Sequence, residues 1–363
     1  MTEMQRHHAR EALRSYAISF AISIVAAGFM SGIPEMNPWL IIPSFGLSFG
    51  TMVTLANVVA PRLRHRSFIV TCVLQAVIYV FVICSAFGLA MWMYLAAYRG
   101  VSPFDPSIGN IFQSIIANRV LQVSMIGSFL LMFAISSVFQ ISKKLGPGVL
   151  WSWMTGKYHE PREETRIFMF LDLKDSTMLG EKLGNIRFSA LVRDFFNDLT
   201  KPVIETKAEV SHYIGDEAVL TWRLNRGLQN ANCIELFYKM REQLQSHAQH
   251  YLKIYGVQPS FKAGAHLGPV VATEVGDIKS EIVYHGDVLN TSSRIQGHCN
   301  DLGSDFLISA ELYEALTLPE GRYAEFMGSY LFKGKEHEVG VYAISDRAPA
   351  SAQQKAAERV SLA

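Results

Sequence analysis

The sequence contains little cysteine, with four residues in 363, and no two of them form a CxxC pair. Disulfide scaffolds and zinc sites both need cysteines that are clustered or regularly spaced. The sequence therefore predicts neither a disulfide framework nor a structural zinc site, which fits a reducing cytosol. The cysteines are Cys72, Cys84, Cys233 and Cys299.

Charge is also scarce. Charged residues make up 18% of the chain, below the usual share of about a quarter, and the formal net charge is only +1. Proteins that bind nucleic acid carry clustered basic residues and a strong positive charge. A nucleic-acid partner is therefore not expected.

Hydrophobic residues make up half of the chain, and they concentrate in four runs that are almost free of charge. A bilayer crossing needs about 18 apolar residues or more, and only the first run is marginal in length. The runs also lack the polar stripe that marks an amphipathic core helix. We therefore expect an N-terminal all-α transmembrane domain of four helices over residues 15–142. The runs are Tyr16–Met30, Trp39–Val59, Phe68–Leu95 and Val120–Ile141.

Basic residues predict the orientation of these helices, because short loops rich in Lys and Arg stay in the cytoplasm. They precede the first run, separate the second from the third and follow the fourth, whereas the other two loops carry almost none. Both termini, including the segment 1–14, are thus expected in the cytoplasm, with the domain in the inner (plasma) membrane. The first run lacks a signal-peptide cleavage site. The basic residues are Arg6, Arg10, Arg14, Arg62, Arg64, Arg66, Lys143 and Lys144.

The four runs contain no histidine and no charged residue in mid-run. Haem held between axial histidines is therefore not expected, and no ion pathway is indicated. The loops on the external side are short, which leaves little room for a folded sensor. A lipid, a small hydrophobic ligand, another membrane protein or no ligand at all remain open as the partner of this domain.

Residues 143–165 connect the apolar half to the rest of the chain. The Gly-Pro-Gly motif at 146–148 ends the fourth helix, and Trp151 and Trp153 are typical of side chains at a membrane surface. The segment is either a plain spacer or a coupling segment that sets the relative pose of two C-terminal domains in a dimer.

The C-terminal half carries two aspartates at the ends of apolar, strand-like runs. Asp172 follows IFMFL, and Asp216 lies in a Gly-Asp turn within Tyr213–Trp222. A carboxylate held by a strand but open to solvent suits Mg²⁺, which takes a few oxygen ligands and a bridging phosphate. Either aspartate alone is more often a turn former or a helix cap than a metal ligand.

A third stretch, Glu281–Gln296, contains a strand-like run, a Gly-Asp turn and a helix start. Its Asn290 and Arg294 are four residues apart and so share a helix face. In order and spacing the three stretches resemble the catalytic domain of the class III nucleotidyl cyclases, which convert ATP or GTP to a 3′,5′-cyclic nucleotide and pyrophosphate. The resemblance covers residues 163–346 and, with the apolar half, implies a membrane-anchored bacterial type.

The expected catalytic domain, residues 166–346, alternates strands and helices, with one continuous helix expected over residues 232–256. Its leading βαββαβ order is that of an α+β ferredoxin-like fold, which is also the core of the cyclase family. Residues 347–363 are expected to form a flexible C-terminal tail.

The resemblance implies that this domain holds two Mg²⁺ or Mn²⁺ ions. Asp172 and Asp216 match the two metal-binding aspartates of the family, and the backbone carbonyl of Leu173 matches a further ligand. The helix start that follows offers free backbone amides to the outer phosphates. Those amides belong to Asp175, Ser176 and Thr177.

Other positions match residues that act on the nucleotide. Asn290 and Arg294 match the pair that orients the ribose and stabilises the charged α-phosphate, an electrostatic role. Lys333 matches the lysine that binds the outer phosphates, and Lys335 is a candidate helper. In this family the metal ligands and these residues come from different chains, so the resemblance implies a homodimer with two equivalent sites.

The positions that face the base depart from the family pattern. Adenylyl cyclases typically have Lys with Asp or Thr there, and guanylyl cyclases have Glu and Cys, whereas this chain has His212 and Val283. A neutral imidazole can donate to adenine or accept from guanine, depending on its tautomer. ATP is favoured because the guanine-type acid is missing. A guanylyl cyclase, or a degenerate cyclase-fold sensor or scaffold, remain the alternatives.

Overall fold

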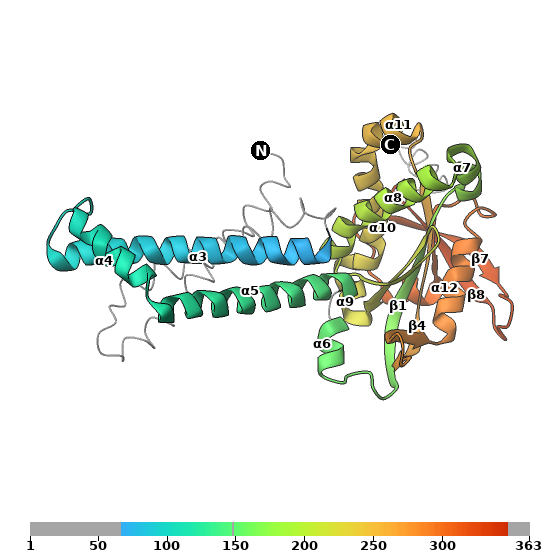
Figure 1. Cartoon of the computed structure of the whole chain (residues 1–363). Coiled ribbons are helices and arrows are strands. Elements are labelled where there is room, and N and C mark those ends of the chain that lie inside the picture. Colours follow the sequence, from blue (N-terminus) through green and yellow to red (C-terminus); the bar gives the residue numbers. More distant parts are fainter. Residues whose placement is uncertain (1–66, 147–148, 348–363) are drawn as a thin grey trace, which may run out of the picture. The chain divides into compact units, whose positions relative to one another are not determined.

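The computed structural model describes residues 67–146 and 149–347 (Figure 1). The predicted N-terminal segment, the first two apolar runs and nearly all of the C-terminal tail lie outside the described residues. The chain divides into two units, Met1–Leu145 and Gly146–Ala363. Each unit is described below by itself.

The described part of the N-terminal unit is helical. The first helix begins after Ser67, whose hydroxyl accepts a hydrogen bond from the amide of Val70. It ends at Gly100, which adopts the left-handed conformation that closes many helices. The helices are α3 (Phe68–Arg99), α4 (Pro106–Ile116) and α5 (Arg119–Leu145).

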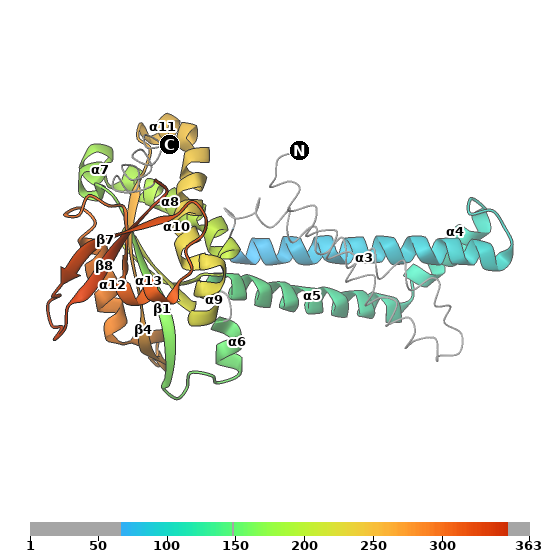
Figure 2. The same cartoon turned by 180° about the vertical axis from the view of Figure 1, so that it is seen from behind.

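Helices α3 and α5 pack side by side, as Figures 1 and 2 show from opposite directions. Between them, the side-chain oxygen of Gln75 accepts hydrogen bonds from Ser136 Oγ at 2.6 Å and from Gln140 Nε2 at 3.2 Å. This pairing satisfies a polar group that is buried among apolar side chains. Other apolar side chains of the pair are exposed, Phe81 and Val123 among them.

The third and fourth predicted spans coincide with α3 and α5, so a helix is confirmed at both places. In the part of the chain that the structure describes, none of the helices is long and apolar enough to cross a membrane. The four-helix transmembrane domain is therefore not confirmed.

The C-terminal unit is a mixed sheet with helices, and its first four strands and their helices follow the predicted βαββαβ order. The chain alternates between strands that end at polar turns and helices with apolar faces. The elements are α6 (Val149–Met154), β1 (Arg162–Leu173), α7 (Ser176–Leu183), α8 (Asn185–Glu205), β2 (Glu209–Ile214), β3 (Glu217–Arg223), α9 (Leu224–Leu228), η1 (Gln229–Ala231), α10 (Asn232–Ser246), α11 (Ala248–Tyr255), β4 (Phe261–Val275), β5 (Glu281–His285), α12 (Asp287–Gly297), β6 (Phe306–Ser309), α13 (Ala310–Ala315), β7 (Tyr323–Tyr330) and β8 (Val339–Ser345).

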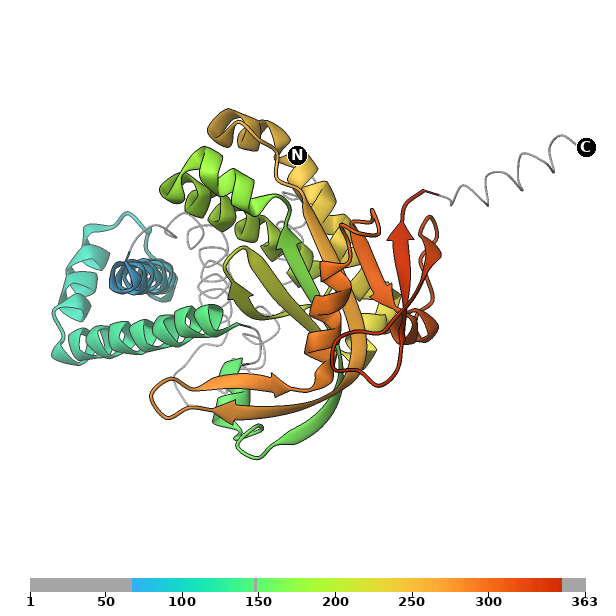
Figure 3. The ribbon, with the colours of Figure 1, turned by 90° about the vertical axis from the view of Figure 1, so that its right-hand side faces the viewer.

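The sheet has eight strands in the order β2-β3-β1-β4-β6-β8-β7, and β5 pairs with β4 beside this path. Strand β1 is central and runs antiparallel to both β3 and β4. The order β2-β3-β1-β4 is the ferredoxin-like arrangement expected from the sequence. The parallel pairing of β4 with β6 makes the sheet mixed. The β4–β5 hairpin projects from the sheet in Figure 3.

From Ile167 to Leu171, strand β1 is buried on both faces, which explains the unbroken apolar run there. Successive side chains of a strand point to opposite faces. Ile167, Met169 and Leu171 pack into the larger core with helices α8 and α10, whereas Phe168 and Phe170 pack on the other face against α12. The aspartate at the end of β1 is thus carried by a rigid strand.

Helix α12 lies very close to strand β4, and a glycine makes this approach possible. A Cβ atom on Gly264 would lie 2.2 Å from the backbone nitrogen of Gln296, nearer than any real contact. Only glycine therefore fits beneath the end of this helix. The close packing fixes α12, which carries Asn290 and Arg294.

Two features of this unit differ from the prediction. The single helix expected over residues 232–256 is broken at His247 into α10 and α11. The short strand β6 and several short helices, namely α6, α9, η1 and α13, were not predicted. Neither difference affects the predicted strand ends that carry Asp172 and Asp216.

Candidate active site

The two predicted metal-binding aspartates lie side by side. Asp172 is paired across β1 and β3 with Glu217, and Asp216 is the residue before Glu217 in the turn between β2 and β3. That turn has only two residues, and its first, Gly215, has φ +61°, which glycine adopts without strain. The Gly-Asp sequence therefore builds the tight turn that brings Asp216 to Asp172.

The electrostatics of this end of the sheet favour a cation. Burial, and then the charge of Asp216, hold the pKa of the Asp172 carboxyl above its ordinary value. Burial together with the charges of Asp172 and Asp216 raises the pKa of Glu217 to about 7. Carboxylates that resist ionisation in this way are stabilised when a positive charge is placed between them.

Two polar side chains also contact Asp172. Gln296 Nε2 donates a hydrogen bond to Asp172 Oδ2 at 3.1 Å, and Lys262 Nζ lies 3.7 Å from the same oxygen. Lys262 is the strand neighbour of Asp172 across β1 and β4. These contacts fix the orientation of the carboxylate.

The donor set fits Mg²⁺ or Mn²⁺. Two carboxylates and a backbone carbonyl, that of Leu173, supply hard oxygen ligands, and such ions usually keep several waters and bind substrate phosphates as well. Among the described residues, no group of three or more His, Cys, Asp and Glu side chains is arranged to hold a metal ion. The predicted set has only two such side chains, Asp172 and Asp216.

The segment after β1 leads into α7 with its first amides free of side-chain caps. Asp175 precedes the helix in a left-handed conformation, φ 55°, and makes no capping hydrogen bond. Ser176 and Thr177 then form the first turn of α7. Unpaired amides at a helix start favour anions such as phosphate.

On α12, Asn290 and Arg294 occupy one face as expected. Asn290 is exposed. Nη1 of Arg294 is buried and has no hydrogen-bond partner. A buried guanidinium nitrogen without an acceptor is costly, so Arg294 carries an unsatisfied donor.

The predicted phosphate lysine lies in the loop between β7 and β8. Lys333 is exposed there. Lys335, two residues further on, forms an ion pair of 2.5 Å with Asp287 at the start of α12. This pair ties the loop of Lys333 to the helix of Asn290 and Arg294.

The two base-facing candidates lie on strands that approach one another. His212 is on β2, where its Nδ1 contacts Ser211 Oγ at 2.9 Å. Desolvation lowers the pKa of His212, and the charge of Glu281 on β5 opposes this shift. Val283 lies two residues beyond Glu281. Because its pKa is lowered, His212 is neutral near pH 7 and can donate or accept.

Comparison with known proteins identifies the family. Residues 158–346 match the adenylate and guanylate cyclase catalytic domain. The chain belongs to this family. The match covers the whole mixed sheet and includes every predicted site residue of the cyclase domain.

Relatives of the cyclase domain include both nucleotide specificities. Adenylate cyclase 2 of Rhizobium meliloti (strain 1021) is 35% identical over 208 residues, covering 57% of this chain and 57% of that protein. A receptor-type guanylate cyclase of Caenorhabditis elegans is 28% identical over 172 residues, 46% of this chain and 13% of that protein. The chain thus spans a little over half of the Rhizobium protein and a small part of the Caenorhabditis protein.

Solved structures support the fold. A bacterial light-regulated adenylyl cyclase superposes with a TM-score of 0.53 at 19% identity, covering 65% of this chain and 68% of that one. At this identity the likeness shows the fold alone.

Within the cyclase domain, the predicted metal ligands and the predicted nucleotide-binding residues are carried by different elements. Among the described residues, no hydrogen bond or ion pair joins Asn290, Arg294 or Lys333 to Asp172 or Asp216. Asn290, Arg294 and Lys333 lie on α12 and in the β7–β8 loop, and the two aspartates lie at the ends of β1 and β2.

Sequence reasoning missed three polar residues of the cyclase site: Lys262, Gln296 and Glu217. Lys262 is brought to Asp172 by the pairing of β1 with β4, and Gln296 by the packing of α12 on β4. Both depend on contacts between distant segments, which no local pattern encodes. Glu217 follows Asp216 directly, so its position beside a predicted metal ligand could have been noticed in the sequence.

Proposed function

We propose that the chain is an adenylate cyclase that converts ATP to 3′,5′-cyclic AMP and pyrophosphate. The observation that carries this proposal is the pair Asp172 and Asp216, held together at strand ends within a domain of the cyclase family. The name of the Rhizobium relative and the absence of a guanine-type acid at His212 favour ATP over GTP.

In this proposal Asp172, Asp216 and the Leu173 carbonyl hold two Mg²⁺ or Mn²⁺ ions. When bound, these ions neutralise phosphate charge and make the ribose hydroxyl more acidic. The carboxylates are mutually repulsive without a cation, as the raised pKa of Asp172 indicates. The rigid end of β1 keeps the ligands in place before substrate arrives.

The remaining residues bind and orient the nucleotide. The amides of Asp175, Ser176 and Thr177 and the ammonium of Lys333 receive the outer phosphates, which leave as pyrophosphate. The amide of Asn290 holds the ribose so that its 3′-oxygen is in line with the α-phosphorus. The guanidinium of Arg294 binds the α-phosphate, where negative charge develops.

We propose that each site is shared between two copies of the chain. The group with Asp172 and Asp216 from one subunit faces the group with Asn290, Arg294 and Lys333 from its partner. Among the described residues, no hydrogen bond or ion pair joins Asn290, Arg294 or Lys333 to either aspartate, and this supports the division. A two-fold axis then generates two equivalent sites.

Identification of the reaction product tests the proposed activity. Detergent-solubilised full-length protein is incubated with ATP or GTP and with Mg²⁺ or Mn²⁺, and the product is identified by mass spectrometry. Cyclic AMP formed from ATP in preference to GTP supports the proposal. Nucleotide binding without a cyclic product would instead mark a degenerate sensor or scaffold.

A guanylate cyclase is the second candidate, because the base-facing positions carry neither typical signature. Neutral His212 can accept from guanine as well as donate to adenine, and Val283 makes no polar contact. Cyclic GMP as the main product in the same assay would favour this candidate.

Substitution of His212 tests whether its ring hydrogen-bonds to the nucleotide base. If its ring donates to adenine, His212→Lys keeps a donor and retains ATP cyclisation. His212→Glu places a carboxylate, which only accepts hydrogen bonds, opposite a ring nitrogen of adenine that also accepts. This change should lower kcat/KM for ATP about five- to hundredfold. The same two changes at His250, an exposed histidine of α11, serve as controls. Equal effects of both His212 variants on ATP and GTP would remove His212 from the site.

We further propose that the N-terminal unit anchors the protein in the plasma membrane, with both termini cytoplasmic. Exposed apolar side chains along α3 and α5, Phe81 and Val123 among them, support a lipid environment. In bacterial cells the full chain should sediment with membranes, resist a carbonate wash and be released by detergent. Recovery in the supernatant without detergent would contradict the anchor.

A further inference from the structure

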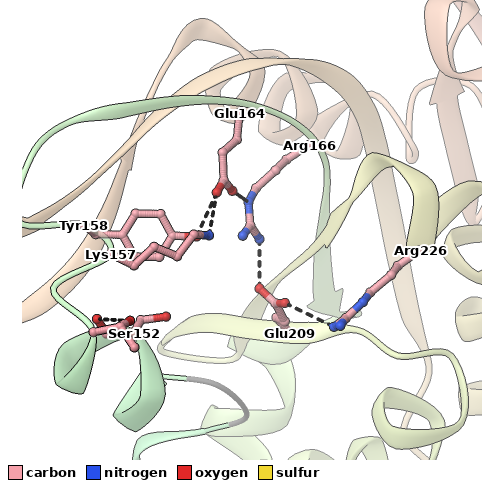
Figure 4. A network of polar contacts seen from close by, with 8 residues as sticks. Ser152, Lys157, Tyr158, Glu164, Arg166, Glu209 and Arg226 are labelled. Carbon is pink, nitrogen blue, oxygen red and sulfur yellow. Dashed lines mark hydrogen bonds and ion pairs between the residues drawn. The ribbon is translucent and has the colours of Figure 1, made fainter.

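A buried arginine, Arg166, lies on β1 six residues before Asp172. The Arg166 side chain is 1% exposed, which is costly for a charge unless it is well paired. Its Nε donates to Glu164 and its Nη1 to Glu209, each at 2.8 Å (Figure 4). Its guanidinium also lies 4.8 Å from the centre of the Tyr284 ring. The arginine therefore has three separate partners.

Two of these partners lie next to the base-facing positions. Glu209 begins β2, three residues before His212, and the pairing of β2 with β3 shifts register between Val210 and His212. Tyr284 follows Val283 on β5. These strands are far apart in the pairing order of the sheet, and Arg166 links them directly.

The third partner connects the network to the segment that enters the cyclase domain. Glu164 accepts hydrogen bonds from Lys157 Nζ and Tyr158 Oη, both at 2.9 Å. These contacts, together with Arg166, hold the pKa of Glu164 at about 2 despite its burial. Lys157 and Tyr158 belong to the predicted coupling segment.

We propose that Arg166 is a positioning residue for the nucleotide, which sets the spacing of β2 and β5 and so of the base-binding positions His212 and Val283. The inference rests on the proposed function and adds a residue to it. The side chain of Arg166 is almost fully buried. It acts through Glu209 and Tyr284, and Glu164 links the same guanidinium to the entering segment. A shift of about 1 Å at a binding position can cost a hundredfold in rate.

Glu209→Gln is the first test, because it removes one charge while Arg166 keeps Glu164 as a partner. We expect about a tenfold increase in KM for ATP, a changed preference between ATP and GTP, and a kcat within about threefold of the wild type. The binding of 3′-deoxy-ATP, which cannot cyclise, should weaken by the same factor in calorimetry.

A second ion pair of the same unit supplies the matched control. Arg322 lies 3.2 Å from Glu235 and 3.6 Å from the centre of the Tyr238 ring, so it repeats the chemistry of Arg166 away from β2 and β5. Glu235→Gln should leave KM and nucleotide preference unchanged, even where the melting temperature falls.

The tyrosine gives an independent pair of variants. Tyr284→Phe keeps the ring over Arg166 and should bind nucleotide as the wild type does. Tyr284→Leu removes the ring and should reproduce the effect of Glu209→Gln.

The outcomes separate the inference from the proposed function. Full-length wild type that binds 3′-deoxy-ATP but forms no cyclic product refutes the function, while the binding shift still tests Arg166. If Glu209→Gln matches Glu235→Gln in both KM and binding, Arg166 is merely structural and the inference is wrong. A wild type that neither cyclises nor binds nucleotide overturns both.

Discussion

Asp172→Ala and Asp216→Ala are each expected to lower turnover at least about a thousandfold, because each removes oxygen ligands from ions that neutralise the reacting phosphates. The measurement is the rate of cyclic AMP formation at saturating ATP and Mg²⁺. Asp301→Ala, which changes an exposed aspartate outside the site, should leave the rate unchanged.

The same variants should remain folded, which separates a lost ligand from a lost structure. Burial and the charge of Asp216 raise the pKa of Asp172, so ionised Asp172 destabilises the folded state at every pH above the raised value. This penalty is absent below the ordinary pKa of the carboxyl. Asp216→Ala removes the part of this penalty that comes from the charge of Asp216. The melting temperature of this variant at pH 7 should therefore equal or exceed that of the wild type. A variant that keeps most of its activity would refute the metal assignment.

The leading part of the fold could be predicted because its signals are local. The apolar run that ends at Asp172 and the Gly-Asp turn at Asp216 mark a strand end and a hairpin without reference to the rest of the chain. The later elements depend on distant contacts. Strand β6 has four residues and pairs in parallel with β4, where Phe306 is the partner of Ala263, 43 residues earlier in the sequence. Such a short run carries little periodicity of its own.

The break between α10 and α11 shows the same limit. The sequence around His247 has neither glycine nor proline, so nothing local ends the helix there. The break coincides with contacts to α8 instead: His247 Nδ1 lies 2.8 Å from Asp198, and Tyr251 donates a hydrogen bond to the other oxygen of that carboxylate. Tertiary contacts thus override a continuous helical pattern.

The candidate site likewise has features that local sequence predicts and features that depend on distant contacts. Spacing alone placed Asn290 and Arg294 on one helix face, whereas the buried state of Arg166 could not be predicted. A charged residue at the edge of an apolar strand is ordinarily expected at the surface. Its burial depends on Glu209 and Tyr284, which the sheet brings in from distant parts of the chain.

Mixing Asp172→Ala chains with Arg294→Ala chains, each inactive alone, is expected to restore activity. In a mixed dimer one site combines the intact Asp172 of one chain with the intact Arg294 of the other, and the second site carries both lesions. Random pairing of equal amounts should therefore recover about a quarter of the wild-type rate, since half of the dimers are mixed and each has one intact site. Cyclic AMP formation is measured after the chains are co-expressed with different affinity tags and the mixed dimers are quantified.

The control is a second mixture, Asp172→Ala with Asp216→Ala. Both lesions then lie in the metal-binding group, so every site of the mixed dimer lacks one ligand and no activity should return. This contrast depends only on which group each residue belongs to. If mixed dimers of Asp172→Ala and Arg294→Ala are present but inactive, each site is built within a single chain, and Arg294 must find its phosphate beside its own Asp172.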